Sequence, residues 1–313
     1  MPADLTKKAS LATMKRLSGS AAEGLEGLER AGHEPETPAE AFAGRRGYEP
    51  GFLDGFKIDL PLLSGAASGD MLSLPDGSGV ELKYMHFSVI MSASRRMPLL
   101  TAVNIDASQS RRLPRISTWS FDGRLDRKQQ FGDALYDNNA LDRGHMVRRE
   151  DPVWGPLADA KTANEDTFHF TNSCPQMAGV NQQTWLSLEN YILQHARVDK
   201  MQVTVFTGPF FAEKDMEYRG ARVPAAFWKV VAIVTDDNRP SATAYKVSQA
   251  EELADLEFVF AGFKTYQISI KQVMKATNLD FSKLLEFDGF SQHEATTGLE
   301  MVEQLDDLRQ VRI

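Results

Sequence analysis

Two pairs of strand-like runs, each joined by a short connection, constrain the fold of this chain more than any other feature. The first pair comprises residues 84–94 and 99–106 around RRMP, and the second comprises residues 225–237 and 241–248 around NRP. Runs rich in β-branched and aromatic residues that are separated by a few turn-forming residues are typical of antiparallel hairpins. The pattern therefore predicts a mainly antiparallel sheet.

Helices and further strands are expected between and after these pairs. The apolar spacing predicts helices over residues 157–166 and 181–200, and a short one in IKQVMKATNL. Strands are expected at TFHFTN (167–172), at residues 201–210 and in TYQISI, with an acidic polar tail after them. Because helices are inserted among paired strands, the chain is expected to be α+β, with a central sheet flanked by helices.

Composition limits the classes of function. The chain has 313 residues and a formal net charge of −8, which argues against a protein whose whole surface coats nucleic acid or anionic lipid. A local basic cleft is still allowed, because RRLPR (111–115) gathers positive charge. Cys174 is the one cysteine, so no intramolecular disulfide can form, and a buried structural role is expected for it. No segment has the roughly 18 consecutive apolar residues of a membrane span, so we expect a cytoplasmic protein with no membrane contact.

The texture of the sequence changes near residue 46. Residues 1–46 are rich in Ala, Glu and Gly and carry only a thin apolar stripe, which predicts a partly helical appendage or linker. Residues 47–313 have the texture of one globular domain. The appendage could serve as a lid or a docking segment, or simply as a tail.

One histidine, His145, lies in a short polar motif. It follows Gly144 in LDRGHM, with Arg143 before it and Arg148 and Arg149 close behind. A glycine allows tight backbone approach or an unusual φ angle. An arginine beside a general base is what phosphate-ester chemistry needs, since the base deprotonates the nucleophile and the guanidinium pairs with phosphate oxygens.

A second motif follows in TNSCPQMAGVNQQTWLSLENY. It offers Asn172, Asn181 and Glu189, and the last two lie on roughly the same side of the predicted helix. A hard cation such as Mg²⁺ keeps several waters and needs only one or two protein oxygens. Each residue also has a structural interpretation, because Asn181 can be a helix N-cap and Glu189 can belong to a solvated helix face. His169, in an alternating apolar run, is expected to be structural.

The three motifs LDRGHM, TFHFTNSCPQ and VNQQTWLSLE, in this order, resemble the DNA/RNA non-specific endonuclease family, the ββα-metal nucleases that include mitochondrial endonuclease G. The resemblance extends over roughly residues 48 to 275, with VFTGPF and VPAAFWKVV among the later similar segments. It implies the ββα-metal nuclease fold.

The resemblance also implies roles for single residues. His145 would be the general base, and Arg143 would stabilise the charged transition state. Asn181 would bind Mg²⁺ directly, with Mn²⁺ as a substitute, and Glu189 would hold metal-bound water. Asn172 would orient the base or the water shell of the metal.

The family also implies an upstream arginine that contacts phosphate. The candidates are Arg115, Arg124 and Arg127, and Arg124 is the first choice. Arg148 and Arg149 are expected to add to a locally basic substrate site. Leu193 stands where some family members carry a second basic residue.

These observations predict a metal-dependent endonuclease that cuts DNA and RNA with little sequence preference and leaves 5′-phosphate ends. Two alternatives stay open: a catalytically silent nucleic-acid-binding or regulatory protein on the same fold, and a phosphodiesterase for a small molecule. Because an unrestrained nuclease endangers its own cell, an inhibitor, a regulatory partner or a larger assembly such as a bacterial defence system is expected. Family members are often homodimers, and the sequence neither supports nor opposes that state.

Overall fold

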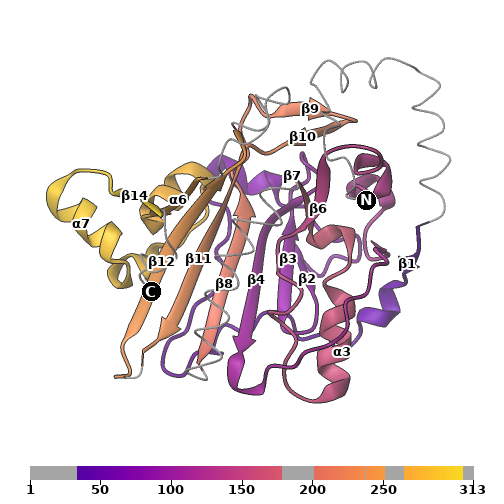
Figure 1. Ribbon diagram of the computed structural model, residues 1–313, viewed down its shortest axis with the longest axis horizontal. Coiled ribbons are helices and arrows are strands. Elements are labelled where there is room, and N and C mark those ends of the chain that lie inside the picture. Colours follow the sequence, from indigo (N-terminus) through magenta and orange to yellow (C-terminus); the bar gives the residue numbers. More distant parts are fainter. Residues whose placement is uncertain (1–33, 178–200, 236, 251–263, 306–313) are drawn as a thin grey trace, which may run out of the picture.

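The computed structural model describes residues 34–177, 201–235, 237–250 and 264–305 (Figure 1). None of the helices within these ranges combines the length and the apolar character that crossing a membrane requires. The predicted helix over residues 181–200 falls outside the described residues, as do Asn181 and Glu189.

An eight-stranded sheet, antiparallel throughout, forms the centre of the described structure (Figure 1). Its strands follow the spatial order β14-β13-β12-β11-β8-β4-β3-β2. In chain order they are β2 (Glu81–Lys83), β3 (Phe87–Met91), β4 (Pro98–Asp106), β8 (Gln202–Pro209), β11 (Ala226–Val234), β12 (Pro240–Ser248), β13 (Lys264–Ile268) and β14 (Val302–Leu305). The mixed α+β class and the large antiparallel sheet confirm the prediction.

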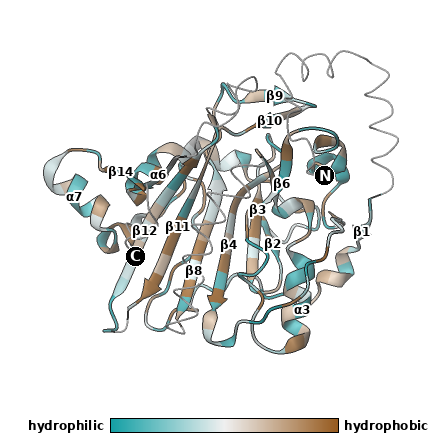
Figure 2. Cartoon of the chain, viewed as in Figure 1, coloured by the Kyte–Doolittle hydropathy of each residue, from teal (hydrophilic) through white to brown (hydrophobic). Residues whose placement is uncertain are grey.

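The two predicted hairpins are both present. Strand β3 pairs with β4 and β11 pairs with β12, each pair antiparallel, with Phe87 opposite Val103 in the first and Val231 opposite Thr243 in the second. Figure 2 shows that hydrophobic residues concentrate in the central strands β4, β8 and β11. Burial of both faces explains why the sequence runs are almost continuously apolar rather than alternating.

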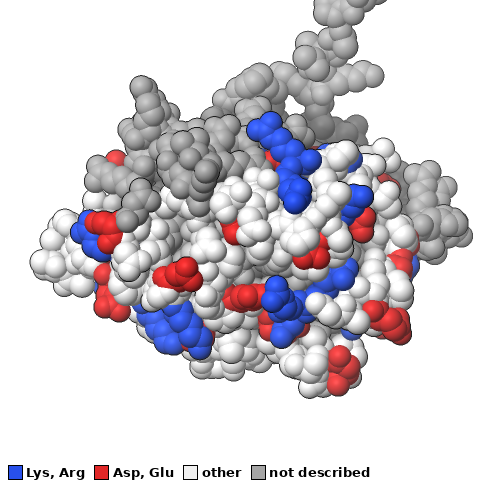
Figure 3. All heavy atoms as spheres, turned by 90° about the horizontal axis from the view of Figure 1, so that it is seen from below, with Lys and Arg blue, Asp and Glu red and all other residues white. Residues whose placement is uncertain are grey.

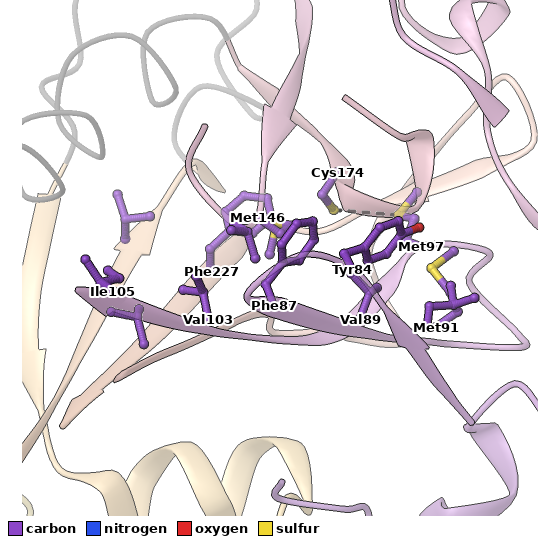
Figure 4. Close-up of a cluster of buried hydrophobic side chains, with 14 of the residues drawn as sticks. Tyr84, Phe87, Val89, Met91, Met97, Val103, Ile105, Met146, Cys174 and Phe227 are labelled. Carbon is purple, nitrogen blue, oxygen red and sulfur yellow. Dashed lines mark hydrogen bonds between the residues drawn. The ribbon is translucent and has the colours of Figure 1, made fainter. Parts of the chain in front are cut away.

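One face of the sheet carries the layer that holds the DRGH motif. Phe87, Val103 and Phe227 project from this face and pack against Met146 and Cys174 from that layer (Figure 4). The thiol of Cys174 is fully buried, and its Sγ lies 3.8 Å from Sδ of Met97. Burial raises the pKa of this thiol well above its usual value, so Cys174 is an apolar packing residue here.

The opposite face is covered by C-terminal elements and by residues 48–63. Helix α6 (Ile270–Thr277) agrees with the short helix predicted in IKQVMKATNL. Helix α7 (Gly289–Thr297) and strand β14 lie in the acidic polar tail, where the sequence predicts neither. Ile270 and Val273 of α6 pack on Trp228 and Val230 of the sheet. Asp288 caps α7 by accepting from the backbone N–H groups of Phe290 and Ser291, which explains why the helix begins there.

Short elements complete the layer on the DRGH side. Helix α3 (Leu157–Asp166) agrees with its predicted range. The predicted strand at 167–172 is wrong, since Phe170–Asn172 form a 3-10 turn.

The remaining strands of the described ranges are β1 (Glu36–Thr37), β5 (Phe121–Asp122), β6 (Leu141–His145), β7 (Ser173–Met177), β9 (Met216–Tyr218) and β10 (Ala221–Val223). The other 3-10 turns span Ala39–Phe42, Gly65–Asp70, Ala107–Gln109, Arg127–Gln129, Asp133–Leu135 and Ser282–Phe287.

Residues 34–46, which the sequence assigned to the appendage, pack onto this layer. Strand β1 pairs in parallel with β5, and the ring of Phe42 is buried against Tyr84 and His169. Nε2 of His169 lies 2.9 Å from Oγ1 of Thr37. The packed structure therefore begins before residue 47.

Candidate active site

Strands β6 and β7 form an antiparallel ribbon that carries the DRGH motif. His145 lies opposite Ser173, and Gly144 lies opposite Cys174. A Cβ atom added to Gly144 would lie 2.2 Å from Cδ of Gln176, so the glycine is needed because a buried side chain crosses its backbone. Close approach, one of the two reasons predicted for Gly144, is therefore the correct one.

His145 sits among aromatic rings. Its imidazole centroid lies 4.6 Å from that of Trp119 and 4.9 Å from that of Phe168, the latter in an edge-to-face arrangement. The side chain as a whole is partly exposed, but Nε2 is buried and has no hydrogen-bond partner among the described residues. A buried ring nitrogen without a partner is rare in folded proteins and marks a position where a further group can bind.

The charges of three arginines act on this imidazole. Burial is the largest cause that lowers the pKa of His145, to about 3, and the positive charges of Arg115, Arg149 and Arg143 act in the same direction. We call these three residues the arginine group. The imidazole is therefore neutral at pH 7 in the unliganded protein, which is the form that can accept a proton.

Arg143 lies two residues before His145 on β6. Residues i and i+2 of a strand project from the same face, so the guanidinium and the imidazole share one side of the ribbon. Nη1 of Arg143 donates a hydrogen bond to Oδ1 of Asp133, and the guanidinium lies 5.7 Å from the ring centroid of Tyr136.

Asn172 is fully buried, and its side chain bonds to the segment that follows β6 and to the segment that precedes β7. Its Oδ1 accepts from the backbone N–H of Val147 at 2.8 Å, and its Nδ2 donates to the carbonyls of Val147 and Thr167, both at 3.0 Å. The backbone carbonyl of Asn172 accepts from the N–H of Met146. These contacts hold the segment that follows His145, and they engage the carboxamide with backbone groups.

The upstream arginines differ sharply in their surroundings. Arg124, the first choice from sequence, is paired with buried Asp122, donates to the carbonyl of Lys83 and stacks 3.8 Å from the ring centroid of Phe42. Arg127 pairs with Glu36. Arg115 is exposed and lies 5.6 Å from the ring centroid of Phe168, which itself contacts His145. Of these three candidates, Arg115 is therefore the exposed one that lies close to the surroundings of His145.

Arg148 and Arg149 both form ion pairs with Glu150, at 3.8 and 2.9 Å. Nη1 of Arg149 also donates to the carbonyl of Leu113 and to Oδ1 of Asn164, so this side chain braces the segment that leads into Arg115. On the face drawn in Figure 3, basic and acidic side chains lie interspersed and form no continuous basic surface.

The predicted metal ligands lie in the undescribed range. Asn181 and Glu189 fall within residues 178–200, which the structure leaves out. In the ranges that it does describe, no three His, Cys, Asp or Glu side chains gather into a group that could hold a metal ion. The described side of the site is cationic, and it offers one unpartnered imidazole nitrogen.

Two features of the site were not singled out from the sequence. Trp119 and Phe168, which enclose His145, lie in stretches that read as turn and strand. Asp133, ten residues before Arg143, carries no motif of its own. These contacts depend on how the chain folds, so no local sequence pattern predicts them.

A model of the DNA/RNA non-specific endonuclease family matches residues 70–287 of this sequence. The chain belongs to this family. The match includes the DRGH ribbon, the aromatic enclosure of His145 and most of the central sheet.

The chain also has relatives among curated proteins. The chain is 37% identical over 276 residues to the uncharacterized protein y4fB of Sinorhizobium fredii, covering 81% of this chain and 41% of y4fB. It is 27% identical over 162 residues to mitochondrial endonuclease G of Bos taurus, covering 47% of this chain and 50% of that protein. The chain thus spans about half the length, or less, of these curated relatives.

The fold is shared with a solved endonuclease G structure, the EndoG/EndoGI complex, described with a mechanism of EndoG inhibition. The similarity has a TM-score of 0.51 with 18% sequence identity, and it covers 64% of this chain and 84% of the other. At this identity the likeness concerns the fold.

Proposed function

We propose that this chain is a metal-dependent endonuclease that hydrolyses phosphodiester bonds in DNA and RNA with little sequence preference. The observation that carries the proposal is the state of His145: a neutral imidazole with an unpartnered Nε2, enclosed by rings and faced by the arginine group. Family membership supplies the reaction class.

In this proposal, the imidazole of His145 accepts a proton from the attacking water. Arg143, on the same face of β6, and exposed Arg115 pair with the non-bridging phosphate oxygens, where negative charge accumulates in the transition state. Asn172 fixes the backbone after the base. Because these groups address phosphate rather than bases, little sequence preference follows.

Asn181 is proposed to bind Mg²⁺ directly, and Glu189 to hold its water. Both residues lie outside the described ranges. When bound, the ion would supply Lewis-acid stabilisation of the leaving oxygen. The products are proposed to carry 5′-phosphate ends.

The test compares cleavage of supercoiled plasmid and of a structured RNA with Mg²⁺, with Mn²⁺ and with excess EDTA. Wild-type protein should cut both substrates with either metal and neither substrate with EDTA. His145→Ala should lower the rate about 10²–10⁴-fold, the usual contribution of a general base. His293→Ala, on the exposed part of α7, is the matched control and should cut like wild type. Full activity of His145→Ala would remove the proposed base.

Restraint by a partner is proposed as well. The structural relative was solved with EndoGI in a complex that inhibits it. That relationship supports the search for a protein inhibitor of this chain. Co-purification from the source cells, followed by the plasmid assay with and without the captured protein, tests it. Captured protein that leaves cleavage unchanged would count against an inhibitor.

A further inference from the structure

Arg143 is tied to a carboxylate that no motif singles out. Its Nη1 donates to Oδ1 of Asp133, and the two side chains are 32% and 39% exposed. Within the described ranges this is the one hydrogen bond that the guanidinium makes. An arginine offers five N–H donors in a planar fork. A bond at one corner of that fork can therefore set its orientation while other donors face a phosphate.

Asp133 is itself held by a residue from the N-terminal segment. Oε1 of Glu34 accepts a hydrogen bond from the backbone N–H of Asp133 at 3.1 Å, and Glu34 is only 9% exposed. The preceding Gly132 makes this possible, because a Cβ atom there would lie 2.8 Å from Oε1 of Glu34 and 2.5 Å from Cζ of Phe121. The loop before the DRGH strand is thus shaped around the Glu34 carboxylate.

The position of Glu34 is fixed in turn by its neighbours. Arg127 donates through Nη2 to the carbonyl of Glu34 at 3.0 Å and through Nε to Oε2 of Glu36 at 2.7 Å. Strand β1 adds its pairing with β5, and Thr37 contacts His169. A carboxylate on so constrained a segment can hold the backbone of Asp133 in one place.

We propose that Asp133 and Glu34 are positioning residues for phosphodiester cleavage: Glu34 fixes the backbone at Asp133, and the Asp133 carboxylate aims the guanidinium of Arg143 at the scissile phosphate. The inference rests on the proposed function of the site. It assigns to residues 34–37 a part in the reaction rather than in a detachable appendage.

A double-mutant cycle on the full chain tests the first step. Asp133→Asn keeps the shape of the side chain but removes its charge, and it should lower kcat roughly tenfold with KM changed less than twofold. Asp133→Glu should recover part of the loss. In an Arg143→Ala background, Asp133→Asn should cause no further loss, because the group that it positions is gone. An equal loss in both backgrounds, or an unchanged kcat in the single variant, would overturn the proposal.

Glu34→Ala tests the second step. It should lower kcat about threefold, and its effect should vanish once Asp133 has been changed to Asn. The matched control is Glu40→Ala, an exposed carboxylate of the same segment, which should cleave like wild type. Asp59→Asn breaks a surface pair with Lys283 and controls for loss of an ion pair elsewhere. Thermal unfolding of each variant separates lost folding from lost orientation.

The two proposals fail in distinguishable ways. Absence of cleavage by wild-type protein with any metal removes the proposed function. Cleavage that depends on His145 but not on Asp133 or Glu34 leaves the function in place and removes the positioning role.

Discussion

The indole of Trp119 packs against the imidazole of His145 with ring centroids 4.6 Å apart and planes at 52°. Trp119 belongs to a buried aromatic cluster with Phe121, Phe168 and Phe170. The proposed base therefore packs against this buried aromatic cluster. The cluster also excludes the water that would stabilise a charged ring. The aromatic cluster therefore contributes both to the orientation and to the neutrality of His145.

Trp119→Leu should weaken both effects. We expect kcat to fall about tenfold, equivalent to about 1.4 kcal/mol of transition-state free energy, because the imidazole is less well oriented. The matched control is Trp154→Leu, since Trp154 stacks on His86 with centroids 3.5 Å apart. Both variants should lose stability in urea titrations, whereas only Trp119→Leu should lower kcat per folded molecule. Equal kcat values for the two variants would show that the packing of Trp119 on His145 does not contribute to catalysis.

Local patterns predicted the sheet, because runs of β-branched and aromatic residues and the turn residues between them act over a few positions. The same reasoning failed at TFHFTN, which alternates like a strand. There Phe168 and Phe170 pack into the aromatic cluster, and the Asn172 carboxamide bonds to Val147, 25 residues away, so the chain turns instead. Long-range partners overrode the local preference.

The candidate site shows the same contrast between local patterns and long-range contacts. DRGH made His145 and Arg143 candidates because their spacing on one strand is local. The choice among Arg115, Arg124 and Arg127 could not be made, since it depends on tertiary pairing: Arg124 is paired with Asp122, whereas Arg115 is exposed beside Phe168. Nothing in the sequence near Asp133 indicated that its carboxylate reaches Arg143.

Asn172→Ala should be strongly destabilising. The substitution removes three buried hydrogen bonds and leaves the Val147 N–H and the Val147 and Thr167 carbonyls without their side-chain partner. With a cost of about 1–3 kcal/mol for each unsatisfied buried group and partial relaxation, the free energy of unfolding should fall by roughly 2–5 kcal/mol. Urea titration measures this change. A loss below about 1 kcal/mol would show that water replaces the carboxamide.

Gly144→Ala tests the close approach of the ribbon strands. The new methyl group would collide with Gln176, whose buried side chain fills the space, and we expect a loss of about 1–3 kcal/mol in the free energy of unfolding. Gln176→Ala in the same chain should remove the collision, so the double variant should be more stable than the sum of the single losses predicts. Strict additivity in urea titrations would mean that the backbone, rather than Gln176, sets the requirement for glycine.

Protonation of His145 should make the folded state sensitive to acid. Its pKa is about 6.5 in an unfolded chain and is lowered to about 3 in the fold, chiefly by burial. Between these values the unfolded chain binds the proton and the folded chain does not, so stability is full above pH 6.5 and falls as the pH drops toward 3. Each such histidine contributes a slope of up to about 1.4 kcal/mol per pH unit.

His145→Gln removes one contribution to that slope. Burial also lowers the pKa values of His86 and His169, so the variant should keep part of the acid sensitivity. Urea titrations at pH 7, 6 and 5 without added metal should show that the loss of stability between pH 7 and 5 is smaller in His145→Gln than in wild type. Identical losses would mean that His145 titrates alike in the folded and the unfolded chain, and the lowered pKa assigned to its burial would then be wrong.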